Sequence, residues 1–197
     1  MSPRLVVLVS GNGSNLQALI DASTSGDLDA HIVAVVANKS DAYGLERATA
    51  AGIDTVVVAA DGAKRPDYDR RLADTVAEFR PDVVVLAGWM RILTANFLDC
   101  FRVLNLHPAL PGQFAGTHAI ERAFEAWQQG TIASSGVMVH WVPDEGVDVG
   151  PVIDTTMVGF EEGDTLATFS ERMHEAEHRL LVHSVQLVLS QVKETTR

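Results

Sequence analysis

The sequence predicts an α/β fold: one domain with an open, mostly parallel, twisted sheet and helices on both faces. Short runs rich in β-branched residues recur without polar alternation, which is typical of strands buried on both faces. Stretches with helical spacing of apolar residues separate these runs, so right-handed crossovers should join consecutive parallel strands. The 197 residues fit one large domain or two small ones. Because no low-complexity linker divides them, we expect residues 1–197 to form a single domain.

Seven segments are expected to form strands. In chain order they are Leu5–Val9, Ile32–Val36, Thr55–Val58, Val83–Leu86, Val103–Leu106, Val137–Val142 and Val152–Val158. The clearest helix lies between the third and fourth strands, where apolar side chains recur at helical steps: Tyr68, Leu72, Val76 and Phe79. A long helix is expected after the last strand, from about Thr165 to Val192.

Composition narrows the classes of function. The chain carries 15 Lys and Arg against 26 Asp and Glu, a formal net charge of −11, which disfavours a nucleic-acid partner. Cys100 is the only cysteine, so neither an intrachain disulfide nor a thiolate metal cage is expected. No apolar run reaches the ~18 residues of a membrane span. We therefore expect a soluble, cytoplasmic protein without membrane contact. A homodimer is compatible with the sequence, which does not fix the oligomeric state.

In parallel sheets, ligands bind beyond the carboxyl ends of the strands. After the first expected strand come Ser10–Asn15 (SGNGSN) and then a helix from Leu16. Free N–H groups at a helix start and closely approaching glycine backbone favour a phosphate. The loop is not a dinucleotide fingerprint, because Leu16 holds the third glycine position, so no NAD is expected. A phosphate site for a mononucleotide-sized ligand is favoured over a plain tight turn in which Ser14 caps the helix.

Asn105 and His107 come at the end of the fifth expected strand. Residues two apart on a strand project to the same face, so both side chains can converge on one atom. An amide donor beside an imidazole suits oxyanion stabilisation and proton transfer. The acidic loop 144–150, with Asp148, could supply a carboxylate that raises the pKa of His107. The alternatives are a structural histidine and a solvated turn.

The last helix contains His174-Glu175-Ala176-Glu177-His178, which matches the H-E-x-x-H zinc motif. Both histidines flank the apolar stripe of the helix and no further ligand pattern follows, so a metal is not expected. Glu177 instead falls about 20° from the centre of that stripe. A carboxylate that points inward needs a partner, either a ligand amine or an arginine at the edge of the core.

Four ordered segments closely resemble the phosphoribosylglycinamide formyltransferase family: Ser10–Asn15 (SGNGSN), Val84–Leu93 (VVLAGWMRIL), Asn105–Pro108 (NLHP) and Asp148–Pro151 (DVGP). The resemblance runs from about Arg4 to Leu181 and implies a Rossmann-like formyltransferase fold. Its N-terminal half would bind the ribonucleotide phosphate, and its C-terminal half would carry the folate cleft and the catalytic loop.

The resemblance also implies roles for individual residues. Asn105, His107 and Asp148 match the catalytic trio of the family. Gly13, Ser14 and Asn15 would hold the phosphate of glycinamide ribonucleotide, and Glu177 would hold its amine. The folate cleft would be formed by Met90, Arg91, Ile92, Leu93 and Asn105, with Arg65 beside it.

The activity implied is transfer of the formyl group of 10-formyltetrahydrofolate, a co-substrate, to glycinamide ribonucleotide in de novo purine (IMP) biosynthesis. The amine would attack the formyl carbon directly, assisted by the trio and without metal or NAD. Methionyl-tRNA formyltransferase is a poorer match, because it normally has a further C-terminal domain and binds an anionic tRNA. Formyltetrahydrofolate deformylase and a non-catalytic phosphosugar-binding module are the remaining alternatives.

Overall fold

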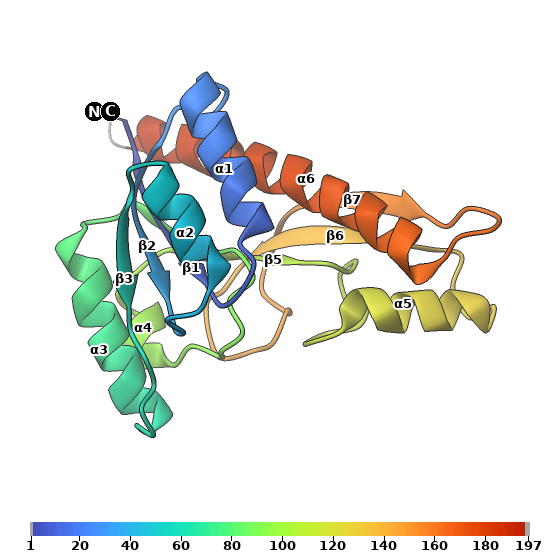
Figure 1. Ribbon diagram of the computed structural model, residues 1–197, viewed down its shortest axis with the longest axis horizontal. Helices are drawn as coiled ribbons and strands as arrows, with labels where there is room; N and C mark the ends of the chain where they lie inside the picture. The colour runs from blue at the N-terminus through green and yellow to red at the C-terminus, as the bar shows by residue number, and fades with distance from the viewer. Residues whose placement is uncertain (1, 196–197) are drawn as a thin grey trace.

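Seven strands form one sheet in the computed structural model, which describes residues 2–195 (Figure 1). The strands are β1 (Arg4–Val9), β2 (His31–Ala37), β3 (Asp54–Val57), β4 (Val83–Leu86), β5 (Val103–His107), β6 (Ser134–Trp141) and β7 (Val152–Gly159). Their order across the sheet is β3-β2-β1-β4-β5-β6-β7. β1 to β5 run parallel to one another, whereas β6 pairs antiparallel with both β5 and β7. The expected open, mostly parallel sheet is confirmed.

Six helices in the described residues cover both faces of this sheet. They are α1 (Ser14–Ser25), α2 (Tyr43–Ala50), α3 (Arg65–Glu78), α4 (Ala95–Leu98), α5 (Ala119–Gln128) and α6 (Leu166–Thr195). Side chains alternate across β1: Leu5 and Val7 join the core beneath α1 and α6, while Val6 and Leu8 join the core beneath α3 and α4. Burial on both faces explains why β1 is apolar throughout.

The third strand differs from its expected burial. A strand buried on both faces is expected at 55–58, but β3 lies at the edge of the sheet and Val57 is 41% exposed. A run of β-branched residues indicates extended backbone, and it carries no information about which strand ends the sheet.

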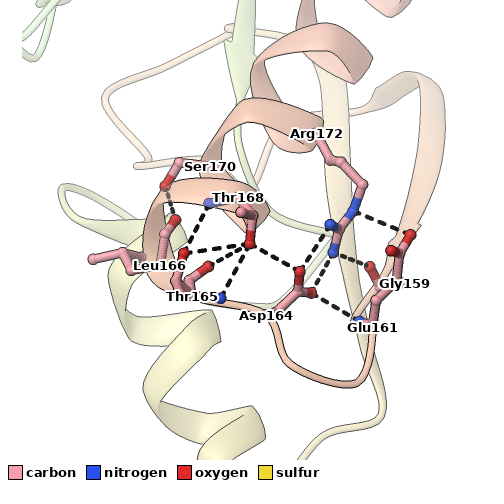
Figure 2. A network of polar contacts seen from close by, with 8 residues as sticks. All are labelled: Gly159, Glu161, Asp164, Thr165, Leu166, Thr168, Ser170 and Arg172. Atoms are coloured by element: carbon pink, nitrogen blue, oxygen red, sulfur yellow. Dashed lines mark hydrogen bonds and ion pairs between the residues drawn. The ribbon is translucent and has the colours of Figure 1, made fainter.

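The turn from β7 into α6 is fixed by a polar network (Figure 2). The Arg172 guanidinium donates to the Asp164 carboxylate and, at 3.2 Å, to the Gly159 carbonyl. The Thr168 hydroxyl donates to the same carboxylate at 3.0 Å. These contacts join the end of β7 to the first two turns of α6, and so help to position the helix that carries Glu177.

Within residues 2–195, no helix is long and apolar enough to cross a membrane.

Candidate active site

Asn105 and His107 lie at the carboxyl end of β5, with side chains on the same face of the sheet as expected from their spacing. The antiparallel register places His140 of β6 directly opposite Asn105. The amide nitrogen Nδ2 of Asn105 lies 3.2 Å from His140 Nε2. Because His140 Nδ1 lies 2.8 Å from the carbonyl oxygen of Trp141, it carries a hydrogen there. In a neutral His140 ring Nε2 then accepts from Asn105, whereas in a charged ring it donates to Asp148, whose Oδ1 lies 3.5 Å away.

Asp148 brings these strands and the loop 144–150 together. Its Oδ1 accepts a hydrogen bond from Asn105 Nδ2 at 3.0 Å, and its Oδ2 lies 3.2 Å from His107 Nδ1. The backbone N–H of Gly116 donates to Oδ2 at 2.8 Å. Asp148 adopts a left-handed backbone conformation with φ +56°, which non-glycine residues rarely adopt. The contacts of its carboxylate hold it in this conformation.

Burial lowers the pKa of His107 from its ordinary value, and the charge of His140 lowers it further. The Asp148 carboxylate acts in the expected direction by raising this pKa, but it does not outweigh burial. The net direction therefore differs from the expectation of a raised pKa. Nε2 of His107 is buried and has no hydrogen-bond partner among the described residues. The resting imidazole is thus neutral at pH 7, with one nitrogen left for a ligand.

The pKa of Asp148 is lowered despite its burial. Burial alone would raise it, but the hydrogen bonds from His140 and from the Gly116 N–H, together with the charge of His107, outweigh that effect. An ionised carboxylate beside Nδ1 can stabilise an imidazolium when a proton reaches His107.

A cavity of about 400 Å³ opens beside this centre. Asn105, His107, His140 and Asp148 all line it. The expected folate residues Met90, Arg91, Ile92 and Leu93 line it as well. Met90 and Ile92 are 66% and 44% exposed, which is high for apolar side chains beside a cavity and suits contact with a ligand.

Arg65 does not line the cavity. It forms an ion pair with Glu145, at 2.7 Å between Nη2 and Oε2, and Glu145 belongs to the cavity-lining loop 144–150. Both side chains are about half exposed. The ion pair places Arg65 next to a cavity-lining residue, and its role at a folate cleft stays a prediction.

The loop 10–15 forms the start of α1. Gly13 has φ +74° and is the N-cap of the helix, without a side-chain cap, so Ser14 is the first helical residue and not the cap. Ser14 and Asn15 therefore present the first N–H groups of α1, which have no intrahelical partners. Ser10 connects this loop to the cavity, since its hydroxyl accepts a hydrogen bond from the Met90 N–H at 2.9 Å.

Glu177 of α6 is 5% exposed and lies beside this loop, as its expected inward direction requires. Its Oε2 is 3.4 Å from Asn15 Nδ2. Burial raises the pKa of Glu177 to about 7, which the Asn15 hydrogen bond only partly opposes. No arginine pairs with Glu177 among the described side chains, which are those of residues 2–191. The structure thus brings the glutamate together with the loop 10–15, and the trio together with the cavity.

Comparison with known proteins gives a consistent result. The formyl transferase family model matches residues 3–185. The phosphoribosylglycinamide formyltransferase of Schizosaccharomyces pombe is 44% identical over 208 residues, covering 98% of this chain and 100% of that protein. The phosphoribosylglycinamide formyltransferase of Dictyostelium discoideum is 45% identical over 204 residues, covering 95% and 98%. The crystal structure of glycinamide ribonucleotide transformylase 1 from Symbiobacterium toebii superposes with a TM-score of 0.90 at 35% identity, covering 96% and 89%.

The chain belongs to the formyl transferase family. As a formyl transferase it acts on small molecules, and the cavity beside His107 has the size of such a site. Among the side chains of residues 2–191, no group of His, Cys, Asp and Glu is arranged to hold a metal ion. His174 and Glu175 of the H-E-x-x-H match are exposed on α6.

His140 also belongs to the site of this formyl transferase, although the sequence alone did not indicate it. It is 1% exposed and contacts both Asn105 and Asp148, at 3.2 Å and 3.5 Å from Nε2. The expected strand at 137–142 already contained it. A polar residue in an otherwise apolar strand was the available signal, but the strand register that places it opposite Asn105 is not readable from one sequence.

Proposed function

We propose that this chain transfers the formyl group of 10-formyltetrahydrofolate to the primary amine of glycinamide ribonucleotide, a step of de novo purine biosynthesis. The observation that carries the proposal is the contact set of His107, Asp148 and Asn105 beside the cavity. The names of the relatives that match nearly the whole chain support the same pair of substrates.

The two substrates would meet at the carboxyl edge of the sheet. The loop 10–15 and the segment 88–93 are joined through Ser10, whose N–H donates to the Gly88 carbonyl at 3.1 Å and whose hydroxyl accepts from Met90. A ribonucleotide on the first segment and a folate on the second would therefore be held in fixed relation. Bringing two bound reactants together supplies much of the acceleration in a bimolecular transfer.

The ribonucleotide side of the site is Gly13, Ser14, Asn15 and Glu177. The N–H groups of Gly13, Ser14 and Asn15 would bind the phosphate at the positive end of the α1 dipole. Glu177 would accept a hydrogen bond from the amine, and a cationic or polarised amine beside it would favour its ionised form. The absence of an arginine partner for Glu177 among the described side chains supports a ligand over a structural role.

The folate side of the site is the cavity wall formed by Met90, Arg91, Ile92 and Leu93. The exposed apolar faces of Met90 and Ile92 would pack against the flat ring system of the donor. The Arg91 guanidinium lies over the Tyr68 ring, 4.2 Å from its centre, but its buried Nε has no hydrogen-bond partner in the described residues and would donate to a polar atom of the donor. Arg65, beside the cavity, would bind the carboxylates of the glutamate tail of the folate donor.

The reaction would proceed by attack of the amine nitrogen on the formyl carbon. Nε2 of neutral His107 would accept the proton that this nitrogen loses, and the resulting imidazolium would be stabilised by Asp148 at Nδ1. His107 would then donate the proton to the folate nitrogen as its bond to the formyl carbon breaks. The products would be the formylated ribonucleotide and tetrahydrofolate, so that protons and electron pairs balance.

Asn105 would have two roles: it would hold Asp148 and stabilise the oxyanion. Its amide nitrogen donates to Asp148 at 3.0 Å and lies 3.2 Å from His140 Nε2, so both of its hydrogens have protein acceptors when His140 is neutral. To stabilise the oxyanion, the hydrogen facing His140 would turn toward the cavity as negative charge develops on the formyl oxygen. The Nε2–H of the imidazolium would be the second donor.

The test is formyl transfer from a 10-formyl folate, followed by absorbance, with and without glycinamide ribonucleotide. Turnover only with the ribonucleotide is expected. Consumption of the folate without it would favour a deformylase and overturn the proposal. Absence of turnover with both ligands still bound would favour a phosphosugar-binding module, again against the proposal.

A further inference from the structure

Arg47 lies on α2, outside the residues discussed so far, and its guanidinium contacts the loop 10–15. Nε donates to the Asn12 carbonyl oxygen at 2.9 Å, and Nη2 donates to the side-chain oxygen of the same residue at 3.2 Å. Nη1 donates to Gln17 Oε1 of α1 at 3.2 Å. The guanidinium also lies over the Tyr43 ring, 4.9 Å from its centre. One side chain thus connects the loop, α1 and α2.

The contact with the Asn12 carbonyl fixes the orientation of a peptide group. In a trans peptide the C=O and the following N–H point in opposite directions. Because Arg47 holds the Asn12 carbonyl toward α2, the N–H of Gly13 points to the opposite side of the loop. The Gly13 N–H is one of the groups proposed to bind the phosphate, and its direction depends on this peptide plane.

The first turn of α2 contacts the same loop through its backbone. The Gly44 N–H donates to the Gly11 carbonyl at 3.0 Å. A Cβ on Gly13 would lie 2.7 Å from the Gly44 Cα, so the two backbones touch at this point. Gln17 continues the network, because its Nε2 donates to Asp21 at 2.8 Å. The loop is thus held on its α2 side by several independent contacts.

We infer that Arg47 is a positioning residue for the phosphate of the amine substrate: it holds the Asn12–Gly13 peptide so that the loop N–H groups face the phosphate. It also places a full positive charge behind the loop in a protein of net charge −11. The inference rests on the proposed function, since it assumes that the loop 10–15 binds a phosphate. It goes beyond that function because Arg47 itself need not touch the substrate.

The test compares glycinamide ribonucleotide with glycinamide riboside, which lacks the phosphate. For Arg47→Met, the KM for the ribonucleotide should rise at least about tenfold. The variant loses the charge-assisted hydrogen bonds that hold the loop, and the loop N–H groups then no longer face the phosphate. The kcat, the KM for the formyl folate and kcat/KM for the riboside should stay within about twofold of wild type. A merely structural role would change the constants for both amine substrates alike, and that result would overturn the inference.

Arg47→Lys separates geometry from charge. Lysine keeps the charge but has no planar fork to hold the Asn12 carbonyl, the Asn12 side chain and Gln17 together. Its KM for the ribonucleotide should stay close to that of Arg47→Met. Full recovery in Arg47→Lys would reduce the role to charge alone and contradict positioning.

Arg4→Met is the matched control. Arg4 also binds a backbone carbonyl through two guanidinium nitrogens, at 3.0 Å and 2.8 Å from the Phe79 oxygen, but at the start of β1, away from the loop. Its KM for the ribonucleotide should equal that of wild type.

Binding of the ribonucleotide measured by calorimetry, without formyl donor, keeps this inference separate from the proposed function. A wild-type protein that binds the ribonucleotide without turning it over would contradict the proposed function only. Arg47→Met should then still bind it at least about tenfold more weakly. Equal affinity of Arg47→Met and wild type for the ribonucleotide would overturn the inference, and so would absence of binding to both.

Discussion

The Glu177 carboxylate lies 3.4 Å from the Asn15 amide nitrogen, measured from Oε2 to Nδ2, although 162 residues separate the two along the chain. Asn15 is the second residue of α1, and Glu177 lies in the middle of α6. A buried carboxylate is thereby placed at the amino end of a helix, where the helix dipole favours negative charge. Even so, burial dominates and raises the pKa of Glu177 to about 7.

Glu177→Gln should change the pH dependence of stability. The folded protein binds the Glu177 proton more tightly than the unfolded chain, so wild-type stability falls as pH rises from about 4.5 to about 7. The variant, which cannot ionise there, should equal wild type near pH 4.5 and exceed it by up to about 3 kcal/mol at pH 8. Urea unfolding at both pH values measures this. Glu175→Gln, exposed on the same helix, should show no such trend; a pH-independent difference for Glu177→Gln would contradict the raised pKa.

His107→Ala and Asp148→Asn should each lower kcat by at least ~10²-fold, because proton transfer loses its carrier or the carrier loses its stabilising charge. Steady-state kinetics measure the loss, and calorimetric binding of the ribonucleotide should be unchanged. Near-normal turnover in either purified variant would remove the assigned role.

His140→Phe should lower kcat about tenfold or more, because the phenyl ring can neither accept from the Asn105 amide nor donate to the Trp141 carbonyl, as the His140 ring does. A positive charge on His140 lowers the pKa of His107, so replacing this imidazole with a phenyl ring should raise that pKa. The acid limb of the kcat profile should therefore move to higher pH. His140→Gln, which can both accept and donate, should retain more activity than His140→Phe. An unmoved limb would show that His140 does not act on His107.

Glu145→Gln should strengthen binding of the formyl folate. The mutation frees Arg65 from its ion pair for the carboxylates of the donor, so the KM for the folate should fall, whereas Arg65→Met should raise it. Stability should change by less than about 1 kcal/mol, since the pair is half exposed. Identical folate KM values for wild type, Glu145→Gln and Arg65→Met would exclude Arg65 from the folate site.

Local sequence patterns predicted most of the fold and part of the candidate site. Two-residue spacing placed Asn105 and His107 on one face, and the helical stripe placed Glu177 inside the protein. Features that depend on tertiary partners were not readable. The register of β5 with β6 brought in His140, and the balance between burial and Asp148 decided the direction of the His107 pKa shift. Edge position likewise exposed β3, whose residues alone resemble a buried strand.

The site is built from two kinds of structure: the antiparallel pair of strands β5 and β6, and segments that follow the ends of other strands. Asn105, His107 and His140 are fixed by ladder hydrogen bonds of neighbouring strands, so their mutual distances are a property of the sheet. The segments 10–13 and 89–93, in contrast, are loops that follow the ends of strands. Loop exchange between related enzymes should therefore alter which amine or which one-carbon donor is accepted, while the spacing of the histidines is inherited unchanged.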